Sequence, residues 1–104
     1  MNIPESVNIL LIGGGAREHA LALGLSNSPH IGTLYATDMG NPGIAQLAVP
    51  VDIPVIGKEL YRLVQFCDRV DIGLVVIGLT ALHYLYGPID ILWIKVVRRL
   101  SIGL

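Results

Sequence analysis

The chain has 104 residues, the length of a single domain built around one hydrophobic core. Hydrophobic residues make up 53% and charged residues 14%, a composition that excludes an intrinsically disordered chain. The net charge is −1 with no basic stripe, so we expect no nucleic acid as a partner. The single cysteine, Cys67, excludes an internal disulfide and fits a reducing, cytoplasmic location.

The first half of the chain alternates apolar and polar segments in the manner of an α/β protein. Val7–Ile12 is an apolar run, broken only by Asn8, which is typical of a strand buried on both faces of a parallel sheet. Ala16–Ser26 contains good helix formers and predicts a helix. Thr33–Thr37 predicts a second strand, and Asp38–Gly43, with its glycines and proline, predicts a loop.

The second half continues the alternation. Ala48–Ile53 predicts a third strand, Lys58–Arg69 a helix, Ile72–Ile77 a fourth buried strand and Pro88–Leu100 a last helix that buries Trp93. The apolar stripe expected on the helix over Lys58–Arg69 consists of Leu60, Leu63, Val64 and Cys67.

A stretch from Ile72 to Ile89 needs a membrane test, because it has no Asp, Glu, Lys or Arg over 18 residues, the shortest spanning length. Glycines, Thr80 and His83 interrupt the stretch, and a buried strand followed by a loop has the same composition. We therefore expect no membrane span. The start of the chain also lacks the basic and then apolar pattern of a signal peptide.

This order of elements predicts one three-layer, Rossmann-like α/β domain over residues 1–104. The sheet should be parallel, with helices on both faces and with Val7–Ile12 and Ile72–Ile77 near its centre. Ligands of such sheets bind beyond the carboxyl ends of the strands. Gly13–Arg17, Asp38–Gly43 and Gly78–Gly87 are the loops expected at that end.

The turn after the first strand has the chemistry of an anion site. Its sequence is Gly13-Gly14-Gly15-Ala16-Arg17-Glu18-His19. Glycines let a ligand approach the backbone, N–H groups at a helix start attract anions, and Arg17 can add a charge-assisted bond to phosphate. Three glycines can also simply make a tight turn, but the strand before them and the helix after them favour a phosphate cradle.

Other sites are weaker hypotheses. A dinucleotide fingerprint needs Gly or Ala where this chain has Glu18, whose carboxylate would oppose a pyrophosphate, although Asp38 could imitate the acidic ribose ligand. An NAD(P)-binding module therefore remains an alternative. No Gly-Lys-Ser or Gly-Lys-Thr loop occurs, and His19, His30 and His83 lack a second ligand at metal spacing, so no metal site and no catalytic residue are assigned.

A second motif makes the glycine turn more specific. The loop after the second predicted strand reads Gly40-Asn41-Pro42-Gly43-Ile44-Ala45. With the Arg-Glu-His-Ala run after the glycines, it resembles the N-terminal pre-ATP-grasp domain of phosphoribosylamine–glycine ligase, also called glycinamide ribonucleotide synthetase. The resemblance covers Asn8 to about Asp90, and residues 91–104 diverge. Ala16 and Met39 replace a glycine and a proline of the family's two motifs.

The resemblance implies a role in de novo purine synthesis. The family joins glycine to 5-phosphoribosylamine and cleaves ATP through an acyl phosphate, with the ATP and Mg²⁺ sites in a later ATP-grasp region. We expect this chain to bind neither cofactor and to be inactive alone, needing that region in cis or on a partner chain. The residues implied to bind the phosphoribosyl substrate are Gly13, Gly14, Gly15, Arg17, Glu18, His19, Gly40, Asn41 and Gly43.

The loop after the fourth strand departs from the family. The family reads Gly-Pro-Glu-x-Pro-Leu there, whereas this chain keeps only Gly78 and has Thr80 in place of the carboxylate. A degenerate, non-catalytic paralogue is therefore a third hypothesis, beside a natural fragment or truncation of the ligase.

Overall fold

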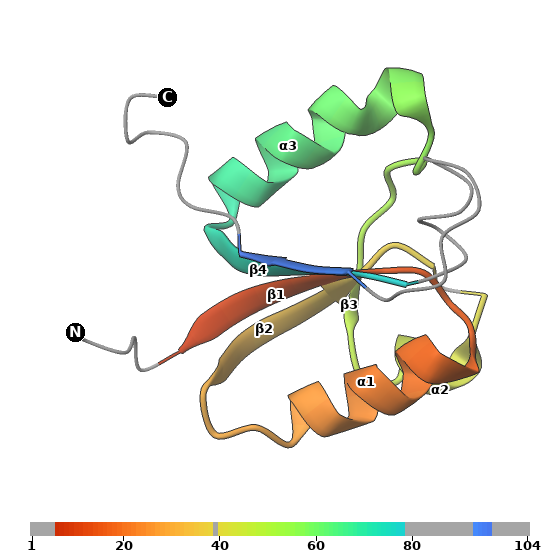
Figure 1. Ribbon diagram of the computed structural model, residues 1–104, viewed down its shortest axis with the longest axis vertical. Helices are drawn as coiled ribbons and strands as arrows, with labels where there is room; N and C mark the ends of the chain where they lie inside the picture. The colour runs from red at the N-terminus through yellow and green to blue at the C-terminus, as the bar shows by residue number, and fades with distance from the viewer. Residues whose placement is uncertain (1–5, 39, 79–92, 97–104) are drawn as a thin grey trace.

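The computed structural model describes residues 6–38, 40–78 and 93–96, which form a five-stranded sheet in the order β3-β2-β1-β4-β5 with helices on both faces (Figure 1). The elements in chain order are β1 Val7–Ile12, α1 Ala16–Ser26, β2 Ile31–Ala36, α2 Pro42–Ala45, β3 Val49–Pro50, a 3₁₀ turn Gly57–Glu59, α3 Leu60–Arg69, β4 Ile72–Ile77 and β5 Trp93–Val96. No helix among these is long and apolar enough to cross a bilayer.

β1 lies at the centre of the sheet. It pairs in parallel with β2 on one side and with β4 on the other, so that Leu10 lies opposite both Tyr35 and Val75. β3 continues the parallel arrangement beside β2. The predicted parallel sheet is therefore confirmed for four strands, and so are the interior positions of β1 and β4. Each has a partner strand on both sides, as their uninterrupted apolar sequences indicate.

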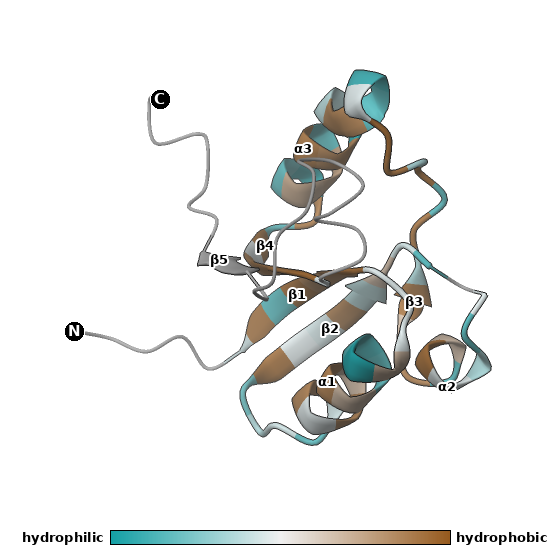
Figure 2. Ribbon diagram, turned by 45° about the vertical axis from the view of Figure 1, so that its right-hand side comes forward, coloured by the Kyte–Doolittle hydropathy of each residue, from teal (hydrophilic) through white to brown (hydrophobic). Residues whose placement is uncertain are grey.

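Two hydrophobic clusters separate the three layers, because alternate residues of a strand face opposite sides of the sheet. Ile9 and Leu11 of β1 pack with Ala22 of α1 and Ile44 of α2. On the other face, Leu10, Ile12, Val51, Ile72 and Val75 pack with Leu63 and Phe66 of α3. Figure 2 shows the sheet as a largely hydrophobic layer between these helices. The three-layer, Rossmann-like architecture is thus confirmed.

One polar residue, Asn8, interrupts the apolar run of β1, and both ends of its side-chain amide form hydrogen bonds. The Asn8 side-chain amide donates to the carbonyl oxygen of Val70 at 2.9 Å, and its Oδ1 accepts from the backbone N–H of Thr33 at 2.9 Å. The strand registers of β1 with β2 and with β4 both shift between this residue and its neighbours. Asn8 therefore supplies the hydrogen bonds that the irregular ladder leaves out.

The predicted last helix is wrong over residues 93–96, where the chain forms β5. This strand runs antiparallel to β4, with Trp93 opposite Ile77 and Val96 opposite Leu74. The segment Trp93-Ile94-Lys95-Val96 is mostly aromatic and β-branched, which suits a strand, and it covers an edge of β4 that would otherwise be open. The rest of that predicted helix, and the expected burial of Trp93, lie outside what the structure describes.

The predicted apolar stripe of α3 is partly wrong. Leu63 is buried as expected, but Val64 is 49% exposed and Phe66, which the prediction omitted, is only 8% exposed. Phe66 is held inward by an edge-to-face contact with Tyr35 of β2, with ring centroids 5.1 Å apart. Cys67 is half-buried beside the same cluster, and this burial raises the pKa of its thiol.

Two other predicted boundaries shift. β2 spans Ile31–Ala36 rather than Thr33–Thr37, and β3 is confined to Val49–Pro50 within the predicted Ala48–Ile53. Pro50 has no N–H to donate, which agrees with its place on an edge strand, and the N–H of Val51 after it still donates to Ala36 of β2 at 3.0 Å.

Candidate functional site

Three loops begin side by side at one edge of the sheet, because β1, β2 and β4 are parallel and end there. The hydrogen-bond ladders to β1 continue for one bond beyond the end of β2 and one bond beyond the end of β4. The N–H of Thr37 donates to Leu11 at 3.1 Å, and that of Gly78 donates to Ile12 at 2.6 Å. The turn that starts at Gly13, the loop that starts at Thr37 and the loop that starts at Gly78 therefore share this edge, as predicted (Figure 1).

The glycine turn joins β1 directly to the first turn of α1. Gly13 has a φ of +119°, a conformation that side chains with a Cβ rarely adopt. Gly15 is the N-cap residue of α1, and its carbonyl oxygen accepts from the N–H of His19 at 3.0 Å. Arg17 is exposed in that first turn. The start of a helix of 11 residues, with its partial positive charge, thus faces the common edge.

Glu18 lies beneath this turn rather than on the surface, with only 3% of its area exposed. Its carboxyl group occupies the space beside three glycines. A Cβ built on Gly13 would lie 2.9 Å from Oε1, one on Gly15 would lie 3.0 Å from Oε2, and one on Gly78 would overlap the carboxyl group outright. The turn after β1 and the loop after β4 are therefore fitted around one buried acidic side chain.

Asn41 connects the second motif to the first. Its Nδ2 donates to the carbonyl oxygen of Gly14 at 2.9 Å, across 27 residues of sequence. Its Oδ1 accepts from the N–H groups of Gly43 at 2.9 Å and Ile44 at 3.3 Å, and so caps α2. Asn before Pro42 is a common N-terminal signature of a helix, so the sequence contained a signal for α2, which the predicted loop missed.

Two further contacts hold the motifs together. The imidazole of His19 occupies the position that a Cβ on Gly43 would take, and the Asp38 carboxylate does the same at Gly14. Asp38 Oδ1 also accepts from the N–H of Gly40 at 2.9 Å. Gly14 and Gly43 are therefore small because side chains of the opposite motif fill the space beside them.

The structure thus gathers all nine predicted site residues at one edge, but in different settings. Glu18 is buried, Asn41 and His19 are partly buried between the motifs, and Arg17 is exposed. Within residues 6–38, 40–78 and 93–96, no carboxylate forms an ion pair with Arg17. In the loop that begins at Gly78, Thr80 lies outside the described residues.

The donor groups at this edge suit an anionic, hydroxyl-rich ligand. Arg17 and the start of α1 supply positive charge, and Asn41 supplies an amide with hydrogen-bonding capacity in a fixed orientation. Across the part of the chain that the structure describes, no group of three or more His, Cys, Asp or Glu could hold a metal ion.

Comparison with known proteins agrees with the two motifs. Residues 7–89 match the family model for the N domain of phosphoribosylglycinamide synthetase. The chain is 46% identical over 72 residues to a phosphoribosylamine–glycine ligase of Rhizobium meliloti, covering 69% of this chain and 16% of that relative. It is 40% identical over 70 residues to the trifunctional purine biosynthetic protein adenosine-3 of Gallus gallus, covering 67% of this chain and 7% of that relative.

The chain therefore spans about a sixth of the length of the bacterial ligase that it matches. The family match covers most of the described structure, including the glycine turn and the Asn41 loop. On this match, the chain belongs to the phosphoribosylglycinamide synthetase N-domain family.

Proposed function

We propose that this chain is the substrate-binding N domain of a phosphoribosylamine–glycine ligase in cytoplasmic purine synthesis. In this proposal the edge formed by the Gly13–Arg17 turn and the Gly40–Gly43 loop binds the phosphoribosyl part of 5-phosphoribosylamine. The hydrogen bond from Asn41 to Gly14 is the main support, because it joins the two family motifs at the start of α1. This hydrogen bond holds the Gly13–Arg17 turn and the Gly40–Gly43 loop together as one binding surface.

The phosphate is assigned to Arg17 and the first N–H groups of α1. A guanidinium and a helix start both favour an anion, and both are open to solvent at this edge. The buried carboxyl group of Glu18 lies under Gly13 and Gly15, so the phosphate is expected toward Arg17 rather than over those glycines. The same arrangement disfavours a dinucleotide, whose pyrophosphate would lie over the glycines.

The sugar is assigned to Asn41. Its amide nitrogen has two hydrogens, and one of them is used on Gly14. The second can donate to a ribose hydroxyl in a direction that the α2 cap fixes. His19, which packs against Gly43, keeps the loop at this distance from α1.

Chemistry on glycine and ATP is assigned to another part of the enzyme. The described residues hold no group of metal-binding side chains, and the chain has no Gly-Lys-Ser or Gly-Lys-Thr phosphate loop. They do not fit a site for Mg²⁺ and ATP. The ATP-grasp region that would supply these sites is therefore expected in cis or on a partner chain. The contribution proposed here is to bind and orient the phosphoribosylamine.

Calorimetric titration of the chain with ribose 5-phosphate tests the proposal. Arg17→Ala removes a charge-assisted hydrogen bond of about 1.5–3 kcal/mol, so affinity should fall roughly 10- to 100-fold. Lys58→Ala is the matched control, because Lys58 is also exposed and basic but precedes α3 on the other face of the sheet. The Lys58→Ala variant should bind ribose 5-phosphate with the same affinity as the unchanged chain.

The remaining hypotheses predict different titrations. Tight binding of NADH without a response to ribose 5-phosphate would support a dinucleotide-binding module. Binding of neither ligand would support a degenerate paralogue, in which Thr80 replaces the carboxylate of the family motif.

A further inference from the structure

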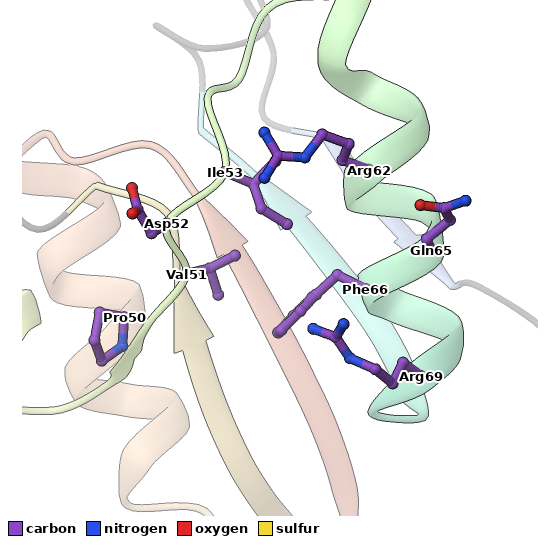
Figure 3. A pocket seen from close by; sticks show the side chains of 8 residues that line it. All are labelled: Pro50, Val51, Asp52, Ile53, Arg62, Gln65, Phe66 and Arg69. Carbon is purple, nitrogen blue, oxygen red and sulfur yellow. The ribbon is translucent and has the colours of Figure 1, made fainter.

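A groove of about 350 Å³ lies between α3 and the segment that leaves β3 (Figure 3). It contains none of the nine residues assigned to the phosphoribosyl site. The residues that line it are Pro50, Val51, Asp52, Ile53, Arg62, Gln65, Phe66 and Arg69.

The helical wall of the groove presents two arginines. Arg62, Phe66 and Arg69 follow one another at the spacing of a single helix face, which puts the arginines about 10 Å apart along the axis. Figure 3 shows them at opposite ends of the groove, with the Phe66 ring between them. Two guanidiniums so placed do not converge on a single small anion.

Both arginines can receive a partner at low cost. The Arg69 guanidinium lies 5.6 Å from the centre of the Phe66 ring, a cation–π contact that orients it while leaving its N–H groups available. Arg62 Nη1 lies 3.3 Å from Glu59 Oε2, but the pair is exposed, and exposed ion pairs contribute little to stability. An incoming carboxylate can therefore replace Glu59 at Arg62.

The opposite wall is the segment that follows β3, from Val51 to Ile53. β3 is the last strand on its side, and the N–H of Val51 is turned inward to Ala36 at 3.0 Å. Within the described ranges, no backbone hydrogen bond reaches Asp52 or Ile53. The free backbone groups of these two residues, which lie between Pro50 and Pro54, can pair with the main chain of an extended peptide. The Asp52 carboxylate is turned away from α3 in Figure 3, so it does not neutralise the arginines.

We propose that this groove binds an extended acidic polypeptide segment. The segment pairs its main chain with the edge at Asp52–Ile53 and places carboxylates on Arg62 and Arg69. The two arginines favour an acidic partner, because Asp52 is turned away from them and the exposed ion pair with Glu59 is easily exchanged. The open edge selects a peptide over a free phosphate or another small anion.

The test is selection of binding peptides from a random heptapeptide library displayed on phage and panned on the immobilised chain. We expect the selected peptides to be enriched in Asp and Glu. In fluorescence anisotropy, a selected peptide should bind Arg62→Gln and Arg69→Gln at least about tenfold more weakly. Lys58→Gln, which removes an exposed positive charge outside the groove, should leave the affinity unchanged.

Two measurements separate the parts of the proposal. N-methylation of alternate peptide bonds removes main-chain donors without changing charge, and it should abolish binding if the peptide pairs with the edge. Failure to select any peptide, selection without acidic enrichment, or unchanged affinity of both arginine variants would overturn the proposal. So would displacement of the peptide by equimolar inorganic phosphate, since that result would make the groove a site for small anions.

Discussion

The side-chain amide of Asn41 lies 2.9 Å from the carbonyl oxygen of Gly14, and the same side chain caps α2 through the N–H groups of Gly43 and Ile44. Asn41 therefore sets both the start of α2 and the distance of α2 from the glycine turn. We expect the stability of the fold and its affinity for the ligand both to depend on Asn41.

Asn41→Ala should lower the free energy of unfolding by about 1–2 kcal/mol, because it removes the N-cap of α2 and the bond to Gly14. Affinity for ribose 5-phosphate should fall in the same variant. Urea denaturation with an unchanged m-value measures the first effect, and calorimetric titration the second. Gln46→Ala, an exposed position at the other end of α2, is the control. Equal stability of the two variants would contradict the capping role.

Gly78→Ala should destabilise the fold by about 1–3 kcal/mol, since the new methyl group overlaps the Glu18 carboxyl group. A double-mutant cycle with Glu18→Ala should show a favourable coupling, because the shorter side chain makes room for the methyl. The matched control is Gly24→Ala in α1. A Cβ there meets nothing within 4 Å, so that variant should gain about 0.5–1 kcal/mol. Additive effects in the cycle would rule out the contact.

Asn8→Ala should cost about 1–3 kcal/mol, because the carbonyl of Val70 and the N–H of Thr33 then lose their partner inside the sheet. Thermal unfolding followed by circular dichroism measures the loss. Asn27→Ala, at the exposed end of α1, is expected to change stability much less, since Asn27 caps the helix through its backbone N–H, which the substitution keeps. A similar loss in both variants would mean that the Asn8 bonds are not specific.

Cys67 should make stability depend on alkaline pH. Its burial raises the pKa of the folded thiol above the ordinary value of 9.0, so the unfolded chain loses its proton first as the pH rises. The contribution is fully present below the unfolded pKa and is lost as the pH rises through the folded one. Urea denaturation at about pH 8 and about pH 10 should show a larger decline than in Cys67→Ala. Parallel declines would exclude the thiol as the cause.

Long apolar runs were the most reliable guide to the fold. β1 and β4 begin and end at the predicted residues because they are short apolar runs bounded by turn residues, and α1 does so because good helix formers fill it between glycines and Asn27. Trp93-Ile94-Lys95-Val96 was ambiguous, since its apolar residues fit a helical stripe as well as a strand. Pairing with β4, distant in sequence, decides between them. On α3, Val64 and Phe66 lie on nearly opposite faces, so the helix can bury only one of them, and Phe66 is the one that contacts Tyr35 of the sheet.

The site was predictable in outline and not in detail. Parallel strands bring their carboxyl ends to one edge, so the meeting of the glycine turn and the Asn41 loop followed from the order of elements. The burial of Glu18 did not, because a glutamate in a first helical turn is usually solvated. Only the three-dimensional neighbourhood shows that Gly78, sixty residues further along the chain, leaves space for it.

Glu18 also constrains the order in which this sequence can change. Gly13, Gly15 and Gly78 are all held to the smallest residue by the same carboxyl group, so none of them can be replaced freely while Glu18 remains. A lineage that shortens Glu18 first makes room at Gly15 and Gly78, whereas Gly13 stays restricted by its positive φ, and a lineage that alters Gly15 or Gly78 first passes through a destabilised intermediate. Gly15 and Gly78 should therefore vary together among descendants, with the change at Glu18 as the substitution that permits theirs, while Gly13 should stay glycine.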